Sequence, residues 1–128
     1  MKRSVLLIED NEQNRYLVTF LLERSGYTVN AFADGARGIE AARSLTPELV
    51  LLDIQLPVMD GYAVARALRQ NEALRRIPIV AVTSYAMPGD REKALEAGCT
   101  GYIEKPINPE TFIAEMERAF SRADKVPA

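Results

Sequence analysis

The stretch LVLLDIQLPVMDG, residues 49–61, gives the clearest signal of the fold. Its first four residues, Leu49 to Leu52, are apolar at every position, and the charged Asp53 follows them at once. Short runs of this kind are typical of strands buried on both faces, as in a parallel sheet sandwiched between helices. Further along, Asp60 can cap a helix that begins after it. The stretch therefore predicts a buried strand, a loop with polar residues and then a helix.

Two further blocks, Val5 to Ile8 and Ile79 to Val82, have the same apolar character. Thr28 to Phe32 and Gly101 to Glu104 are weaker strand candidates, placed by their spacing as much as by their composition. Segments of helical period lie between these runs, so strands and helices alternate five times. This alternation predicts an α/β fold: a doubly wound, five-stranded parallel sheet with five helices and right-handed crossovers.

Residues that begin or end helices bound the helical segments. The first three helices are expected from about Glu12 to Ser25, from a cap at Asp34 to about Ser44, and after the cap at Asp60. The fourth is expected from Pro88 to Gly98, and Asn108-Pro109 marks the start of the fifth. The domain is expected to span residues 1–122, with residues 123–128 as a flexible C-terminal tail.

The composition limits the possible functions. The 128 residues are 48% hydrophobic, which suits one domain with a buried core. Sixteen basic residues stand against 18 acidic ones, a net charge of −2, so the broad positive field that favours nucleic acid binding is missing. No apolar run is long enough for a signal peptide or a membrane span. We expect a soluble, cytoplasmic chain with neither nucleic acid nor membrane as a partner.

The absence of histidine and the presence of one cysteine, Cys99, restrict the chemistry further. Ser-His-Asp and Cys-His catalysis are excluded, and the familiar zinc, haem and iron–sulfur ligand sets cannot be assembled. A lone thiol also forms no internal disulfide, which fits a reducing compartment. Any bound metal must be held by oxygen atoms.

Polar residues follow four of the expected strands. Glu9 and Asp10 follow the first, Asp53 the third, Thr83 the fourth and Lys105 the fifth. Ligands bind at the carboxyl ends of the strands in doubly wound sheets, so these side chains are expected to meet there. Crowded carboxylates repel one another unless a cation lies among them, and a few oxygen ligands completed by water favour magnesium.

A magnesium site beside a lysine and a hydroxyl is suited to handling a phosphoryl group. Because a serine or cysteine with a histidine base is absent, one carboxylate must be the nucleophile. We choose Asp53, because it follows the most apolar strand and should lie nearest the middle of the sheet. Glu9 and Asp10 would then hold the metal.

Four segments of the chain, in this order, resemble the receiver domain of two-component response regulators. They are LIEDN at residues 7–11, LDIQLPVMDG at 52–61, VTS at 82–84 and GYIEKPI at 101–107. Together they cover nearly the whole chain in register. The resemblance implies a flavodoxin-like fold with strand order 2-1-3-4-5. It also implies a phosphorylation-dependent signalling switch in place of an enzyme with turnover.

The resemblance assigns chemical roles to single residues. Asp53 would accept a phosphoryl group from a phosphohistidine, with Thr83 and Lys105 contacting the phosphate. Mg²⁺, for which Mn²⁺ could substitute, would be bound by Asp10, Asp53 and the backbone carbonyl of Gln55. Glu9 would reach the metal directly or through water.

Further implied roles concern the switch itself. Thr83 and Tyr102 would change conformation together, and Gln55 and Tyr85 would set the lifetime of the phosphate. The Lys105-Pro106 peptide bond would be cis. The response would be a changed surface around the fourth helix, the fifth strand and the fifth helix.

The implied partners are proteins. A histidine kinase or a histidine phosphotransfer protein would donate the phosphate, docking around Gln13, Asn14, Pro106 and Ile107. A downstream protein would bind the altered surface, or the phosphate would be passed on in a phosphorelay. The length of the chain favours a stand-alone regulator, and a receiver fragment of a hybrid histidine kinase is the alternative.

Three other functions fit the residues less well. An aspartate-nucleophile phosphatase of the haloacid dehalogenase kind needs a second acid two residues after the nucleophile, where this chain has Gln55. A flavin-binding module of similar topology would need a hydroxyl-rich phosphate loop after the first strand, and the chain has none there and no tryptophan. A scaffold that binds partners without phosphorylation would not need the complete set of acids, threonine and lysine.

Overall fold

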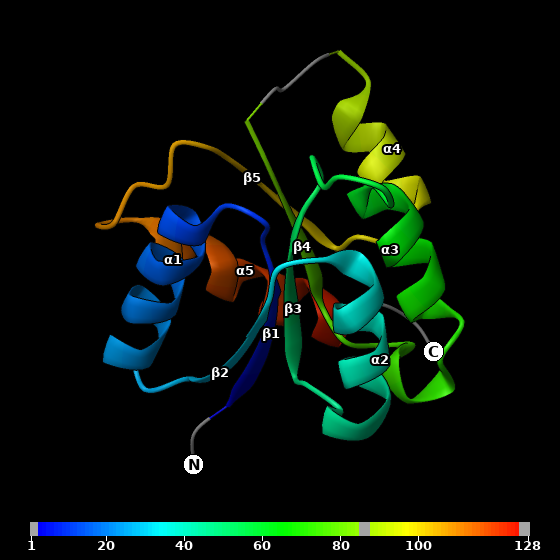
Figure 1. Cartoon of the computed structure of the whole chain (residues 1–128), viewed down its shortest axis with the longest axis horizontal. Coiled ribbons are helices and arrows are strands. Elements are labelled where there is room, and N and C mark those ends of the chain that lie inside the picture. Colours follow the sequence, from blue (N-terminus) through cyan, green and yellow to red (C-terminus); the bar gives the residue numbers. More distant parts are fainter. Residues whose placement is uncertain (1–2, 85–87, 126–128) are drawn as a thin grey trace.

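One parallel sheet is built from five strands: β1 (Ser4–Ile8), β2 (Thr28–Phe32), β3 (Leu49–Asp53), β4 (Ile79–Thr83) and β5 (Gly101–Glu104). Their order in the computed structural model, which describes residues 3–84 and 88–125, is β2-β1-β3-β4-β5 (Figure 1). This confirms the predicted fold class and strand order. It also confirms β3 as the central strand, because the sheet has two strands on either side of it.

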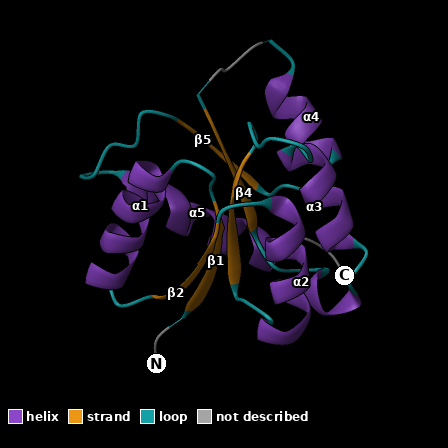
Figure 2. Ribbon diagram, viewed as in Figure 1, coloured by secondary structure: helices purple, strands orange, loops and turns teal. Residues whose placement is uncertain are grey.

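Helices cover both faces of the sheet: α1 (Glu12–Arg24), α2 (Gly35–Leu45), α3 (Gly61–Arg69), α4 (Asp90–Glu96) and α5 (Phe112–Lys125). A short 3-10 helix, η1 (Glu72–Leu74), precedes β4. Helices α1 and α5 lie on one face, and α2, α3 and α4 lie on the other (Figure 2). The molecule therefore has three layers, with the sheet in the middle.

The hydrophobic core has two halves, because side chains alternate between the faces of each strand. Leu6 and Ile8 of β1 pack with residues of α2 and α3, whereas Val5 and Leu7 pack with residues of α1 and α5. Every residue of β3 and of β4 is buried. The continuous apolar runs that identified these strands in the sequence thus reflect coverage on both faces.

Helix α4 differs from the sequence prediction at its start. It begins at Asp90 and not at Pro88, and the residue before it, Gly89, has a φ of 90°, in the left-handed region. A residue in that conformation cannot belong to a right-handed helix, so the predicted start was wrong by two residues. Helix α5 continues to Lys125, beyond the expected domain boundary at residue 122.

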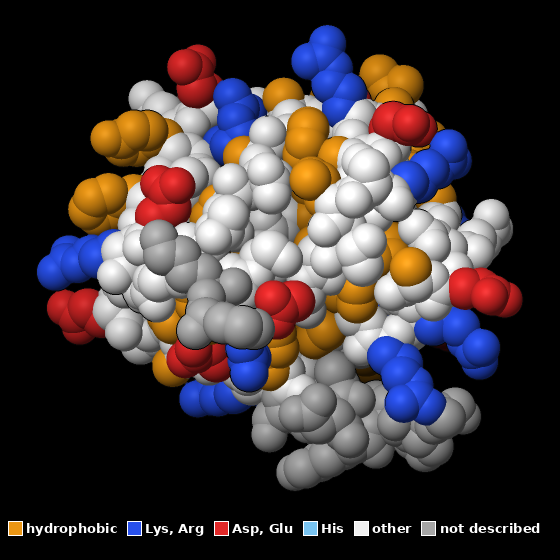
Figure 3. Space-filling view, turned by 90° about the horizontal axis from the view of Figure 1, so that it is seen from below, with side chains coloured by type: hydrophobic (Ala, Val, Ile, Leu, Met, Phe, Trp, Pro, Cys, Tyr) orange, Lys and Arg blue, Asp and Glu red, His pale blue; other side chains and the backbone are white. Residues whose placement is uncertain are grey.

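The surface at the amino ends of the strands carries charges of both signs. In the view from below, lysine and arginine side chains are interspersed with aspartate and glutamate among the described residues (Figure 3). They form no broad patch of one sign on that face. A separate finding is that none of the described helices has the length and hydrophobicity needed to cross a membrane.

Candidate functional site

The carboxyl edge of the sheet brings together polar residues from distant parts of the chain. Glu9 and Asp10 come directly after β1, Asp53 and Thr83 are the last residues of β3 and β4, and Lys105 follows β5. Because all the strands are parallel, these ends lie at the same edge. Glu9 and Asp10 follow β1, and Asp53 ends β3. The winding of the sheet changes direction between these two strands, and ligands of such folds usually bind at this point.

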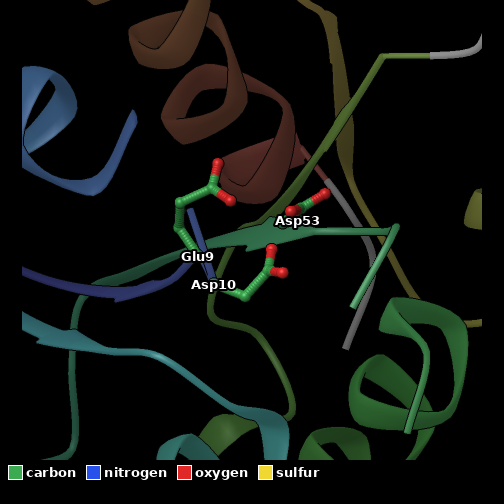
Figure 4. A group of neighbouring side chains, drawn as sticks. All are labelled: Glu9, Asp10 and Asp53. Atoms are coloured by element: carbon green, nitrogen blue, oxygen red, sulfur yellow. The ribbon is translucent and has the colours of Figure 1, made fainter. Parts of the chain in front are cut away.

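Three carboxylates form a cluster at this edge (Figure 4). One oxygen of each, from Glu9, Asp10 and Asp53, lies within 4.8 Å of the other two. Glu9 and Asp53 are each only 3% exposed, while Asp10 is exposed. The cluster thus opens to solvent on the side of Asp10, where a small cation could enter.

Lys105 reaches the two buried acids of the cluster. The Nζ atom of Lys105 is 2.7 Å from Glu9 Oε1 and 3.5 Å from Asp53 Oδ2. The peptide bond between Lys105 and Pro106 is cis. Among the described residues, one ammonium group thus contacts two of the three clustered acids, and the cluster retains an excess of negative charge.

That excess, together with burial, changes the protonation of Asp53. Burial raises the pKa of its carboxyl group, and the neighbouring Glu9 raises it further, to about 6 from the usual 3.8. Lys105 and a hydrogen bond of 2.9 Å from the Gln55 backbone N–H oppose the rise. Ionised Asp53 is therefore costly in this fold, and a bound cation would relieve the cost.

Local capping and close packing hold the loops around the cluster. Asn11 caps α1, its side chain accepting a hydrogen bond of 2.9 Å from the Asn14 backbone N–H. Asp60 caps α3 in the same way, at 2.9 Å from the Ala63 N–H, as the sequence predicted. At Gly61 a Cβ atom would lie only 2.5 Å from the Cα atom of Ile54. A larger residue could not pack this close to the end of β3.

Thr83 ends the neighbouring strand and is 2% exposed. The Nε2 atom of Gln55 donates a hydrogen bond to Thr83 Oγ1, and Gln55 Oε1 accepts one of 2.9 Å from the Ser84 backbone N–H. This contact could not be predicted from the residue pattern, because the pattern does not determine which way an exposed glutamine side chain points.

Tyr102 lies apart from the carboxylate cluster, on β5. It is half-buried, and its hydroxyl is buried with no hydrogen-bond partner among the described residues. Tyr85, for which a role in phosphate lifetime is expected, lies outside the residues that the structure describes.

The residues at this edge fit a magnesium ion. The donor set consists of carboxylate oxygens, which Mg²⁺ prefers, and it is partly open, which leaves room for the water that this ion retains. The raised pKa of Asp53 indicates that negative charge there lacks full compensation. These observations support the predicted class of metal.

Comparison with known proteins gives a consistent result. A family model described as the response regulator receiver domain matches residues 5–117. The chain is 44% identical over 117 residues to the polar-differentiation response regulator DivK of Brucella ovis, a match that covers 91% of this chain and 95% of that protein.

Solved structures give the same answer. The chemotaxis protein CheY4 of Vibrio cholerae has a TM-score of 0.90 at 28% identity, over 93% of this chain and 99% of that one. The receiver domain of the sensor histidine kinase PA1611 from Pseudomonas aeruginosa has a TM-score of 0.86 at 36% identity, over 94% and 99% of the two chains. That structure has a magnesium ion coordinated in the active site cleft.

Proposed function

This chain belongs to the response regulator receiver domain family of two-component signalling, and we propose that it is a phosphorylation switch whose acceptor is Asp53. Receiver domains act as signalling switches and not as classical enzymes. The observation that carries the proposal is the position of Asp53, at the end of the central strand, within reach of two other carboxylates and one lysine. The proposed compartment is the cytoplasm.

The proposed metal is Mg²⁺, with Mn²⁺ able to replace it. Asp10, Asp53 and the backbone carbonyl of Gln55 would hold it, and Glu9 would contact it directly or through water. When bound, the ion would offset the negative charge that the carboxylates and a phosphoryl group bring together. The support is the cluster of three carboxylates and the raised pKa of Asp53.

The proposed transfer begins with an oxygen of the Asp53 carboxylate attacking the phosphorus atom of a phosphohistidine. The P–N bond breaks, its electron pair stays on the ring, and the imidazole, protonated at its other nitrogen, leaves as a neutral group. No general base is needed, because Asp53 is ionised above its pKa of about 6. Lys105, 3.5 Å from Asp53 Oδ2, would place its ammonium group against an oxygen of the transferred group.

The proposed consequence is a change of conformation. The added group carries a charge of about −1.5 to −2 and strong acceptor oxygens, which would attract the Thr83 hydroxyl. Tyr102 would then change its position, and the surface formed by α4, β5 and α5 would bind a downstream protein or take part in a phosphorelay. Gln55 and Tyr85 would set the lifetime of the phosphate.

The proposed donor is a histidine kinase or a histidine phosphotransfer protein. A groove of about 400 Å³ lies beside Lys105 and is also lined by Asn14, Leu17, Ser84, Pro106 and Ile107. These residues come from α1, from the residue after β4 and from the loop after β5, and they include three of the four at which docking is expected. A donor helix seated there would bring its phosphohistidine to Asp53.

Intact-mass measurement tests the proposal directly. The chain is incubated with acetyl phosphate, with Mg²⁺ or with a chelator, as the parent, as Asp53→Asn and as Asp34→Asn. Asp34 caps α2 and is absent from the proposed site, so its variant is the matched control. We expect the mass gain of one phosphoryl group in the parent and the control with Mg²⁺, and none with Asp53→Asn. A gain that persists in Asp53→Asn would assign the acceptor to another residue.

A further inference from the structure

The side chain of Gln55 bridges the ends of two neighbouring strands. From the loop after β3, its Nε2 atom donates to Thr83 Oγ1, and its Oε1 atom accepts a hydrogen bond of 2.9 Å from the Ser84 backbone N–H. Its own backbone N–H donates to Asp53 Oδ1 at 2.9 Å. The same residue therefore contacts the acceptor through its backbone and the end of β4 through its side chain.

Packing does not account for this arrangement. Gln55 is exposed, so its side chain could extend into water without losing buried apolar contacts. Fixing a long side chain at both ends of its amide costs conformational entropy, which the two hydrogen bonds must offset. We therefore look for the role of this contact in its two partners, the Thr83 hydroxyl and the Ser84 backbone N–H.

Both of these groups are suited to an anion. The Ser84 N–H is a backbone donor at the carboxyl edge of the sheet, and the Thr83 hydroxyl lies beside it. A phosphoryl group on Asp53 would bring strong acceptor oxygens to this edge. The carboxamide oxygen of Gln55 already accepts the Ser84 N–H, and so it takes the place that an anionic oxygen would take.

We propose that the Gln55 carboxamide is a latch of the unphosphorylated state, which holds Thr83 and Ser84 until a phosphoryl group on Asp53 displaces it. This inference rests on the proposed function of Asp53. It gives the Gln55 side chain control over how readily the switch is turned on, a property separate from the lifetime of the phosphate. Loss of the amide favours activation, because the phosphoryl group then no longer has to displace the Gln55 amide from these two residues.

The first test needs neither a phosphoryl donor nor a metal. Amide hydrogen exchange at Ser84, followed by NMR, reports its bond to Gln55 Oε1. We expect exchange about tenfold faster in Gln55→Met, which lacks the amide, and in Gln55→Asn, whose amide is too short to span the gap. Both variants keep the backbone carbonyl of residue 55. Gln70→Met, at the exposed end of α3, is the control and should leave Ser84 unchanged. An unchanged Ser84 rate in Gln55→Met would overturn the latch.

The second test measures the affinity for beryllofluoride in the presence of Mg²⁺. When bound to an aspartate carboxylate, beryllofluoride forms a stable analogue of an aspartyl phosphate. We expect a dissociation constant about tenfold lower in both Gln55 variants than in the parent and in Gln70→Met. If the parent binds and the Gln55 variants bind no more tightly, the latch is wrong while the proposed function stands. If the parent itself binds no beryllofluoride, the proposed function fails and the latch fails with it.

Discussion

The carboxyl group of Asp53 is driven toward its protonated form by its surroundings. Its pKa is about 6 in the folded chain, against the usual 3.8, chiefly because of burial and then because of Glu9. A raised pKa means that the folded state binds the proton more tightly than the unfolded state. This group therefore has no effect on stability below about pH 4, becomes destabilising as the pH rises, and is fully so above about pH 6.

Asp53→Asn should accordingly stabilise the metal-free protein at neutral pH. We expect its free energy of unfolding to exceed that of the parent by about 3 kcal/mol at pH 7.5 and by less than about 1 kcal/mol at pH 4. Urea denaturation in the presence of a chelator measures both values, and Asp34→Asn, at the cap of α2 and away from the site, is the matched aspartate control. An equal gain at the two pH values would show that ionisation of Asp53 is not its cause.

The residues of the site differ in how far the sequence could predict them. Glu9, Asp53, Thr83 and Lys105 were placed correctly at one edge, because each stands at the end of a strand and parallel strands end together. The Gln55 bridge could not be predicted, since it depends on a side-chain conformation and on the gap between two loops. The buried hydroxyl of Tyr102 depends likewise on how β5 packs with α4 and with the core beneath it.

Among the helices and strands, those that are more deeply buried were easier to predict from the sequence. The central strands β3 and β4 are buried throughout and gave unbroken apolar runs. The edge strands β2 and β5 are partly exposed and gave weaker signals. The helix η1 gave none, because its three residues are too few to form a periodic pattern.

One arginine connects three of these elements. Arg69 lies at the end of α3. Its Nε atom donates a hydrogen bond of 2.9 Å to Gly98 O, which follows α4. Its Nη1 atom donates hydrogen bonds of 2.7 Å each to Leu74 O, in η1, and to Ile77 O, after η1. These backbone carbonyls lie at helix ends and turns, where the regular helical hydrogen bonds stop. Leu74 O also accepts a hydrogen bond of 3.3 Å from the Ile77 backbone N–H. The guanidinium is partly buried, and burial lowers its pKa.

Replacing Arg69 should destabilise the protein, because the contacts that join α3, η1 and the end of α4 are lost together. We expect Arg69→Met, which keeps the apolar stem, to lower the free energy of unfolding by about 2 to 4 kcal/mol, because three partly buried carbonyls lose a charged donor. The free energy of unfolding of Arg69→Lys should lie between those of the parent and of Arg69→Met, since an ammonium group cannot reproduce the planar fork of donors of a guanidinium group. Urea denaturation measures the loss. Arg66→Met, an exposed position on the same helix, should change stability by less than about 0.5 kcal/mol. Equal losses at the two positions would contradict the role of Arg69.

The whole molecule determines how complete the switch can be. Moving a two-state equilibrium from 1:99 to 99:1 requires about 5.5 kcal/mol of differential interaction. Charge-assisted hydrogen bonds from Thr83 and Lys105 to a phosphoryl group would supply about 1.5 to 3 kcal/mol each. Against this, Lys105 must weaken its 2.7 Å contact with Glu9, and Thr83 and Ser84 must leave the Gln55 amide. The net gain falls short of a complete switch.

We therefore expect the phosphorylated chain to populate both conformations when no downstream protein is bound. Tyr102 is a suitable reporter, because its half-buried side chain belongs to β5, one of the three elements of the proposed binding surface. NMR of the beryllofluoride-saturated chain should give two sets of Tyr102 ring signals, or averaged positions with exchange broadening. A binding partner would add its own differential affinity and complete the shift. A single, fully shifted set of signals in the free chain would mean that phosphorylation alone provides more energy than these contacts can supply.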